Sequence, residues 1–262
     1  MNLELNPRIP FLFLWIALLT LPGLVACGRT PADPALTVSA ASDLTLAFEE
    51  LGTMYETETG TPVVFNFGST GKLAQQIEQG APVDLFAAAN TAYVERLAAA
   101  GRLLPGSVQP YARGRLALWT HADASFRPRA LADLLDPAVK RIAIANPEHA
   151  PYGMAARQAL QSAGVWEAIQ PKLVLGENVR QTLQFAETGN VDVAIVALSL
   201  CLTTDGAWTL VPEDLHDPID QSLAIVAGSP RPEAARRFIA LLRSPRGQAV
   251  LRRYGFTLPD GE

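Results

Sequence analysis

Short apolar strands alternate with helices along most of this chain, and that alternation most restricts the fold. Apolar side chains recur at helical spacing from Leu44 until Gly60, between two short β-prone segments. Two further helices follow in the same manner. The order strand, helix, strand, helix, strand is typical of a parallel sheet covered by helices on both faces. The first run has strands at 36–40, 62–67 and 83–88, with a third helix at 92–100.

A second run of the same kind begins at Gly114. It comprises strands at 114–119, 141–145 and 191–196, with helices at 130–135, 154–163 and 179–187. The chain then returns through a strand at 220–227 to helices at 233–242 and 248–254. A chain of 262 residues with this pattern predicts an α/β protein of two lobes, each a mainly parallel sheet flanked by helices. We expect one lobe from 36–113 and 220–262, the other from 114–219, and the ligand cleft between them.

The first segment has the features of an export signal. Phe11 to Leu21 is apolar but short for a membrane span, and it ends in Leu-Val-Ala-Cys at 24–27. That tetrapeptide resembles the lipobox of bacterial lipoproteins, which implies a signal peptide at 1–26 and a lipid on the Cys27 thiol. An ordinary secretory signal with a coincidental cysteine is the alternative. We expect a linker at 27–35 and a periplasmic or cell-surface protein held to the membrane by its lipid alone.

The composition excludes several other functions. The formal net charge is −5, and no stretch concentrates Lys and Arg among aromatic residues, so nucleic acid is not an expected partner. The three histidines have no metal-ligand spacing, which argues against a zinc site. With Cys27 lipidated, Cys201 would have no disulfide partner, and its apolar surroundings predict a buried structural thiol.

Two turns rich in Ser and Thr lead from a strand into a helix, at 39–44 and 67–73. Each offers hydroxyls and free backbone N–H groups at the positive end of a helix, and together these groups hold a small anion without Lys or Arg. Gly68 and Gly71 let the backbone approach a guest closely. The alternative is that Ser42 or Asp43, and Ser69 or Thr70, merely cap their helices. Two equivalent turns favour one cleft that binds one oxyanion.

Two later turns have the same position between a strand and a helix. The first, at 146–153, holds Tyr152 between a proline and a glycine, which presents its hydroxyl rigidly. In the second, at 176–179, Asn178 can cap the helix and the amide of Val179 is free. Both turns add neutral hydrogen-bond donors to the predicted cleft.

At these positions the chain resembles the periplasmic molybdate-binding proteins, the solute receptors of molybdate ABC importers. The resemblance spans 36–258 and is carried by Ala-Ala-Ser-Asp-Leu-Thr at 40–45, Phe-Gly-Ser-Thr-Gly-Lys-Leu at 67–73, Gly-Ala-Pro-Val-Asp at 80–84, Asn-Pro-Glu-His-Ala-Pro-Tyr-Gly at 146–153, Glu-Asn-Val-Arg at 177–180 and Arg-Tyr-Gly-Phe at 253–256. It implies a type II periplasmic-binding-protein fold, a monomer without cofactor or catalysis, and an ABC permease as partner.

The resemblance also implies the binding residues. Molybdate or tungstate would be held by hydroxyls and backbone amides of Ser42, Asp43, Thr70, Tyr152 and Val179, and we add Ser69 from the second turn. Many relatives have a serine where this chain has Asp43, whose carboxylate would repel a dianion. We therefore expect the Asp43 side chain to cap its helix while its amide serves the ligand. Some relatives have a tyrosine where this chain has Ala197, and we expect Tyr152 to supply that donor.

A site made of neutral donors has no acceptor for a protonated oxyanion, so it should reject hydrogen phosphate. Two other functions remain open. One is a receptor of the same fold for another oxyanion, or for a metal ion with Asp43 as a direct ligand. The other is a hydrolase that uses Ser42, His149 and Asp84 or Asp43, although the chain lacks a Gly-x-Ser-x-Gly elbow.

Overall fold

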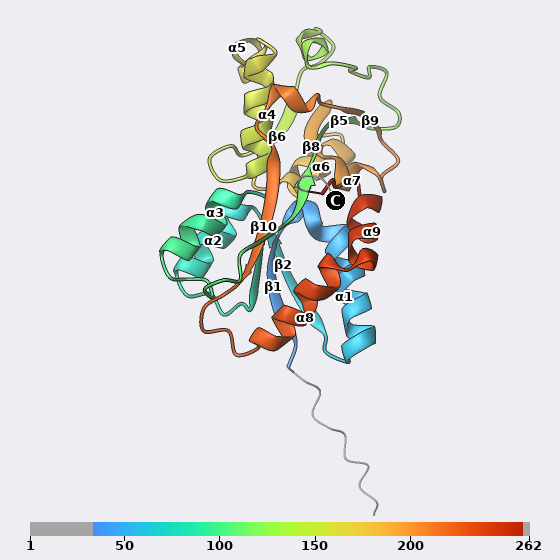
Figure 1. Cartoon of the computed structure of the whole chain (residues 1–262). Helices are drawn as coiled ribbons and strands as arrows, with labels where there is room; N and C mark the ends of the chain where they lie inside the picture. Colours follow the sequence, from blue (N-terminus) through green and yellow to red (C-terminus); the bar gives the residue numbers. More distant parts are fainter. Residues whose placement is uncertain (1–33, 259–262) are drawn as a thin grey trace, which may run out of the picture. The chain divides into compact units, whose positions relative to one another are not determined.

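The computed structural model describes residues 34–258, in which ten strands form two five-stranded sheets (Figure 1). The first sheet has the order β2-β1-β3-β10-β4 and the second the order β7-β6-β8-β5-β9. The predicted α/β fold with two helix-flanked sheets is therefore confirmed. The strands of the first sheet are β1 (Leu36–Ala41), β2 (Val63–Gly68), β3 (Leu85–Ala88), β4 (Gln109–Gly114) and β10 (Ile219–Ile225). Those of the second are β5 (Leu116–Thr120), β6 (Ile142–Ala145), β7 (Leu173–Gly176), β8 (Val193–Ala197) and β9 (Ala207–Leu210).

Both sheets are mainly parallel, with one reversed strand each. In the first, β1 pairs in parallel with β2 and β3, whereas β10 is antiparallel to both of its neighbours, β3 and β4. In the second, β6 pairs in parallel with β7 and β8, whereas β5 is antiparallel to β8 and β9. Four strands of each sheet thus run in one direction, and the carboxyl ends of these strands lie at the same edge.

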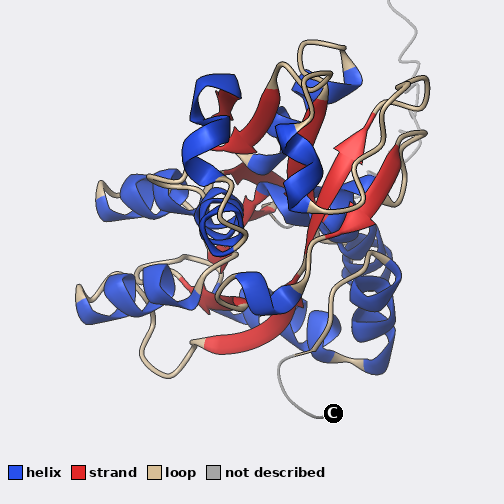
Figure 2. Cartoon of the chain, turned by 90° about the horizontal axis from the view of Figure 1, so that it is seen from above, coloured by secondary structure: helices blue, strands red, loops and turns tan. Residues whose placement is uncertain are grey.

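Helices cover both faces of the first sheet (Figures 1 and 2). Side chains alternate between the faces, so Phe86 and Ala88 pack with α2 (Thr70–Glu78) and α3 (Thr91–Ala99), while Leu85 and Ala87 join the opposite core. That core contains Phe48 and Phe238 with their rings 5.8 Å apart. It is built with α1 (Thr45–Thr59), α8 (Pro232–Arg243) and α9 (Pro245–Arg253).

The second sheet packs against α4 (Pro151–Ser162), α6 (Val179–Glu187) and the short α7 (Leu198–Cys201). The helix predicted at 130–135 is a 3-10 helix, η2 (Leu131–Leu135), and another, η1 (Ser42–Leu44), precedes α1. The sequence did not predict strands β4, β7 and β9. All three are edge strands, of four to six residues. The remaining short helices are α5 (Trp166–Ile169), η3 (Gln170–Lys172) and η4 (Glu213–Leu215).

The chain passes from the first sheet to the second at Arg115, between β4 and β5, and returns ahead of β10. The two passages lie side by side, because Ile219 pairs with Gly114 in an antiparallel ladder. The division into lobes at 113/114 and 219/220 stays a prediction.

The predicted signal peptide, the lipobox cysteine Cys27 and all but the last two residues of the predicted linker lie outside the described residues. Among residues 34–258, no helix combines the length and the apolar composition that a membrane span requires.

Candidate ligand-binding site

The two Ser/Thr turns of the first sheet lie next to each other. Their strands pair in parallel with Ala41 opposite Gly68, so Ser42 and Ser69 leave the sheet at the same level. Ser42 opens η1, and Ser69 precedes the first residue of α2, Thr70. The turns therefore bring two helical N-termini to one edge of the sheet, as the alternation of strands and helices predicts.

None of these side chains caps its helix. The structure records no side-chain capping bond for η1, α1 or α2, so the capping alternative and the expected capping role of Asp43 are both wrong. The Thr70 hydroxyl oxygen instead accepts from the Ala89 N–H at 3.1 Å, which leaves its own hydrogen to donate. The Ser42 hydroxyl makes no hydrogen bond with another described residue, and Ser42 is 4% exposed. Both hydroxyls are buried donors without an acceptor among the described residues.

The second sheet repeats the arrangement. Ala145 at the end of β6 pairs with Gly176 at the end of β7, and the Asn146 N–H donates to the Gly176 carbonyl at 2.8 Å. Asn178 caps α6, as predicted, by accepting from the Gln181 N–H at 3.0 Å. Val179 is the first residue of α6, so its N–H has no partner within the helix. Helix α6, which Val179 begins, also packs next to η1, which Ser42 begins.

Turns of the two sheets touch each other directly. The Gly71 N–H donates to the His149 carbonyl at 2.9 Å, and the Ser69 hydroxyl lies 2.7 Å from His149 Nδ1. A Cβ on Gly71 would lie 2.7 Å from the same carbonyl oxygen, so only glycine permits this approach. At the exposed rim, Lys72 Nζ lies 3.6 Å from a carboxylate oxygen of Glu177. We call the contacts of Ser69 and Gly71 with His149 the inter-sheet latch.

Asp43 forms the centre of a buried polar cluster. Its Oδ2 accepts from Tyr152 Oη at 3.0 Å and from Gln221 Nε2 at 2.6 Å. Gln221 is held in turn by Tyr111, whose hydroxyl donates to Gln221 Oε1 at 2.7 Å. The Ser199 hydroxyl donates to the Asp43 backbone carbonyl at 2.8 Å. The other carboxyl oxygen, Asp43 Oδ1, is buried without a hydrogen-bond partner.

Burial raises the pKa of Asp43 to about 6, and the hydrogen bonds from Gln221 and Tyr152 oppose that rise only in part. No charged side chain contributes to this shift of the Asp43 pKa. Burial and the nearby Asp43 carboxylate raise the pKa values of Tyr111 and Tyr152 well above 10, so both phenols remain protonated donors. The cluster therefore carries one negative charge at neutral pH, with neutral donors around one of its two oxygens.

The structure thus brings together Ser42, Asp43, Ser69, Thr70, Tyr152 and Val179 where the turns of the two sheets meet. Tyr152, expected to replace the tyrosine absent at Ala197, has its hydroxyl on Asp43. It fits there because residue 114 is glycine: a Cβ at Gly114 would lie 2.0 Å from the Tyr152 hydroxyl. Ala197 itself is buried at the end of β8.

Sequence reasoning missed three residues of this cluster, namely Tyr111, Ser199 and Gln221. Gln221 had a usable signal, because it alternates with Ile219, Leu223 and Ile225 and so belongs to the apolar face of its strand. An amide on such a face requires buried partners. Ser199 lies in an apolar segment and Tyr111 between Gln-Pro and Ala-Arg, and neither had such a signal.

The catalytic alternative lacks its geometry. His149 contacts Ser69 rather than Ser42, and the Asp84 carboxylate accepts from Arg231, Ser229 and the Thr37 N–H. Among residues 34–258 there is also no group of three or more His, Cys, Asp or Glu side chains that could hold a metal ion. The described part of the chain therefore offers an anion-binding arrangement of neutral donors, with one carboxyl.

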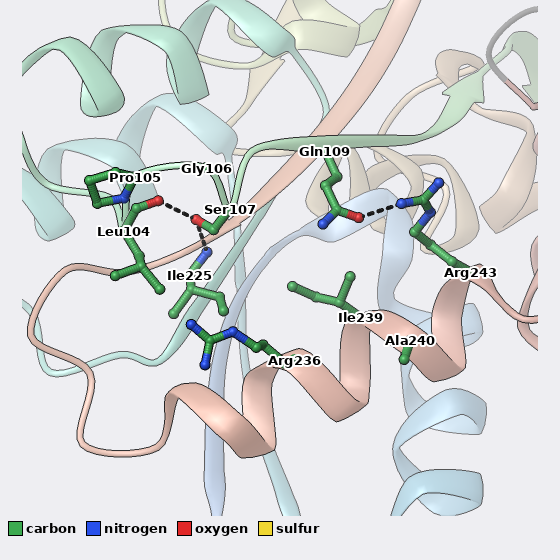
Figure 3. A pocket seen from close by; sticks show the side chains of 10 residues that line it. All are labelled: Leu104, Pro105, Gly106, Ser107, Gln109, Ile225, Arg236, Ile239, Ala240 and Arg243. Atoms are coloured by element: carbon green, nitrogen blue, oxygen red, sulfur yellow. Dashed lines mark hydrogen bonds between the residues drawn. The ribbon is translucent and has the colours of Figure 1, made fainter.

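A hollow of about 520 Å³ lies elsewhere, between helix α8 and the segment that leads into β4 (Figure 3). Ser107 at its edge bridges the Leu104 carbonyl and the Ile225 N–H, and Gln109 accepts from Arg243. None of its lining residues belongs to the four turns. It is a separate surface feature of the first sheet.

Residues 36–257 match the family model described as bacterial extracellular solute-binding protein. The chain is 34% identical to the molybdate-binding protein ModA of Rhodobacter capsulatus over 86% of this chain and 90% of that protein. It is 36% identical to the molybdate-binding protein ModA of Azotobacter vinelandii, over 90% of this chain and 94% of the relative.

Among solved structures, the fold resembles the periplasmic molybdate-binding protein of Azotobacter vinelandii with a TM-score of 0.81. That match covers 86% of this chain and all of the other, at 30% identity. Sequence and fold therefore point to the same group of proteins over nearly the whole described region.

Proposed function

This chain belongs to the family of bacterial extracellular solute-binding proteins, and we propose that it captures molybdate, or tungstate, for an ABC importer. The observation that carries the proposal is the meeting of four strand-to-helix turns, two from each sheet, around buried hydroxyls and orphaned helical N–H groups. Such donors bind a dehydrated oxyanion without a counter-charge. The relatives from Rhodobacter capsulatus and Azotobacter vinelandii, 34% and 36% identical to this chain, are molybdate-binding proteins.

We assign the anion contacts to six residues. The hydroxyls of Ser42 and Thr70 have hydrogens to donate, and the Val179 N–H is free at the start of α6. Asp43 contributes from the buried cluster, Tyr152 contributes through Asp43, to whose Oδ2 its one hydroxyl hydrogen is donated, and Ser69 contributes from the latch. An oxyanion between these turns would contact elements of both sheets at once, so its binding favours the closed arrangement.

The protein binds and delivers its solute and is not an enzyme. The closed, loaded form would dock on the permease of the importer as a monomer. We propose that Cys27 carries a lipid that keeps the protein at the outer surface of the membrane. A metal ion as the solute is disfavoured, because Asp43 is surrounded by neutral hydrogen-bond donors rather than by further carboxylates or histidines.

Isothermal titration calorimetry of the purified protein with molybdate, tungstate, sulfate and phosphate tests the proposal. We expect tight binding of molybdate and tungstate. Sulfate should bind at least tenfold more weakly, because this smaller anion would not reach all of the turns at once. If the protein bound sulfate but neither molybdate nor tungstate, the site would be an oxyanion site but the assigned solute would be wrong. Absence of binding by all four anions would overturn the oxyanion site.

A further inference from the structure

We propose that the complex holds one proton shared between Asp43 Oδ1 and an oxygen of the bound oxyanion, so that Asp43 couples capture of a dianion to uptake of a proton. This inference rests on the proposed function, because it takes an oxyanion to be the ligand of the site. The structural basis is the asymmetry of the carboxyl group: Oδ2 accepts two hydrogen bonds, whereas Oδ1 is buried and has none.

A buried carboxyl oxygen without a partner is uncommon, because it loses its hydration and gains nothing in return. Tyr152 and Gln221 both donate to Oδ2, and each is held in place by the element to which it belongs. Gln221 cannot easily rotate its amide, since its Oε1 accepts from Tyr111. Tyr152, Gln221 and the backbone N–H of Asp43 itself are the donors near this carboxyl, and none of them makes a hydrogen bond to Oδ1, so a partner for Oδ1 would come from outside the cluster.

An ionised Oδ1 can only accept a hydrogen bond, and so can every oxygen of a fully deprotonated oxyanion. Two acceptors in contact repel each other, whereas one proton between them makes a short, charge-assisted hydrogen bond. The proton comes from solvent and forms one O–H bond, either on Asp43 or on the ligand oxygen; no other covalent bond forms or breaks. Either location requires one proton to be taken up when the ligand enters as a dianion.

Among residues 34–258, Tyr152 and Gln221 are the only side chains hydrogen-bonded to the Asp43 carboxyl. The elements that contribute to it or pack on η1 are α4, β10 and β4, together with α1, α6, α7 and β2. Asp220 on β10 pairs with Arg113 on β4, and Glu50 on α1 binds Arg253 and Tyr254.

The other titratable groups on these elements also lie away from the carboxyl. Arg157 on α4 pairs with Glu148. On α6, Arg180 is exposed and Glu187 acts on Cys201 of α7. On α1, Glu58 pairs with Arg246 and the Tyr55 hydroxyl donates to the Ala234 carbonyl, while Glu49 and Glu56 are exposed. The partners of the Asp43 carboxyl itself are neutral, and its raised pKa agrees with this.

The same geometry alters the expected selectivity. A site of neutral donors alone rejects hydrogen phosphate because it lacks an acceptor, but Oδ1 is an acceptor when Asp43 is ionised. An anion that brings its own proton can satisfy Oδ1 without proton uptake. Asp43 thus determines which protonation state of the solute is bound, and Asp43→Asn should convert this position into a permanent donor.

The test counts protons by calorimetry at pH 8, with molybdate titrated in phosphate-free buffers of different ionisation enthalpy. At this pH His149 stays neutral, because burial lowers its pKa below 6.5. We expect uptake of about one proton by the wild type and about none by Asp43→Asn, whose amide oxygen can keep both donors while its NH₂ faces the ligand. The wild-type affinity should fall about tenfold per pH unit between pH 7.5 and 9, and that of the variant should stay flat.

Glu148→Gln is the matched control, because it removes an exposed carboxylate near the turns and should keep the wild-type proton count. Molybdate binding by the wild type without proton uptake would overturn this inference and leave the proposed function intact. Failure of every oxyanion to bind would overturn the proposed function and this inference with it. If Asp43→Asn does not fold, the number of protons taken up by the wild type still tests the inference by itself.

Discussion

The Ser69 hydroxyl lies 2.7 Å from Nδ1 of His149, and this contact joins a turn of the first sheet to a turn of the second. Ser69→Ala removes it without changing the backbone. We expect molybdate affinity to fall about fivefold, as for the loss of one neutral hydrogen bond. Calorimetry measures the change, and Lys72→Ala is the comparison: its ion pair with Glu177 is half exposed and should change affinity less than twofold. Equal losses in both variants would contradict the latch.

Gly71→Ala should separate binding from stability. The added Cβ would lie 2.7 Å from the His149 carbonyl oxygen, so the turns of the two sheets could not approach as they do. Within α2, however, alanine favours the helix over glycine by about 1 kcal/mol. We expect affinity to fall at least about tenfold while the unfolding midpoint without ligand does not decrease.

The control for that variant is Gly68→Ala, in the same turn, whose added Cβ would have the flexible Leu73 side chain as its nearest neighbour. Its affinity should stay near that of the wild type. If Gly71→Ala also bound molybdate normally, the close approach of the two sheets would not be needed for binding.

Ser42→Ala should weaken binding without weakening the fold. The Ser42 hydroxyl has no partner among the described residues, so its removal breaks no hydrogen bond of the protein itself. A hydrogen bond to a charged oxyanion contributes about 1.5–3 kcal/mol, so affinity should fall by roughly one to two orders of magnitude. Thermal unfolding without ligand should match the wild type, and the exposed Ser162→Ala should change neither quantity. A large loss of stability would show that Ser42 serves the fold instead.

Asp43→Asn should stabilise the protein at neutral pH. Because burial raises the pKa of Asp43 from 3.8 to about 6, the folded state binds more protons than the unfolded state between these values. The free energy of unfolding therefore falls as pH rises from about 4 to about 6, and the penalty persists above that. Asparagine lacks this penalty, so we expect the variant to be more stable by roughly 2–3 kcal/mol at pH 7.5 and little changed at pH 4. Urea unfolding at both pH values measures the difference; equal effects at the two values would contradict it.

The sequence was sufficient for the parts of this molecule that local patterns encode. Alternating strands and helices predicted both sheets, and Asn178 before α6 was correctly read as a cap. The second-sheet strands β7 and β9 were missed because short edge strands have little periodicity. The lobe boundary near Arg113, placed where the pattern of strands and helices restarts, stays a prediction.

The polar cluster could not be predicted in the same way. The role of Asp43 depends on Tyr152, 109 residues away, and on Gln221, 178 residues away, and no local rule places these side chains together. An acidic residue at a helix start ordinarily predicts a cap. Here Asp43 binds Tyr152 and Gln221 instead of capping its helix. The local indication was the amide of Gln221 on the apolar face of β10.

Strand β10 lies between β3 and β4 in the first sheet, yet in the chain it follows every strand of the second sheet. During synthesis from the N-terminus, β3 and β4 therefore lack their common neighbour β10 until all strands of the second sheet have been made. The second sheet has no such dependence, because its five strands are contiguous from β5 to β9. The second sheet can therefore form once β9 has emerged, whereas the first sheet, and with it the bond of Gln221 to Asp43, is completed only by β10.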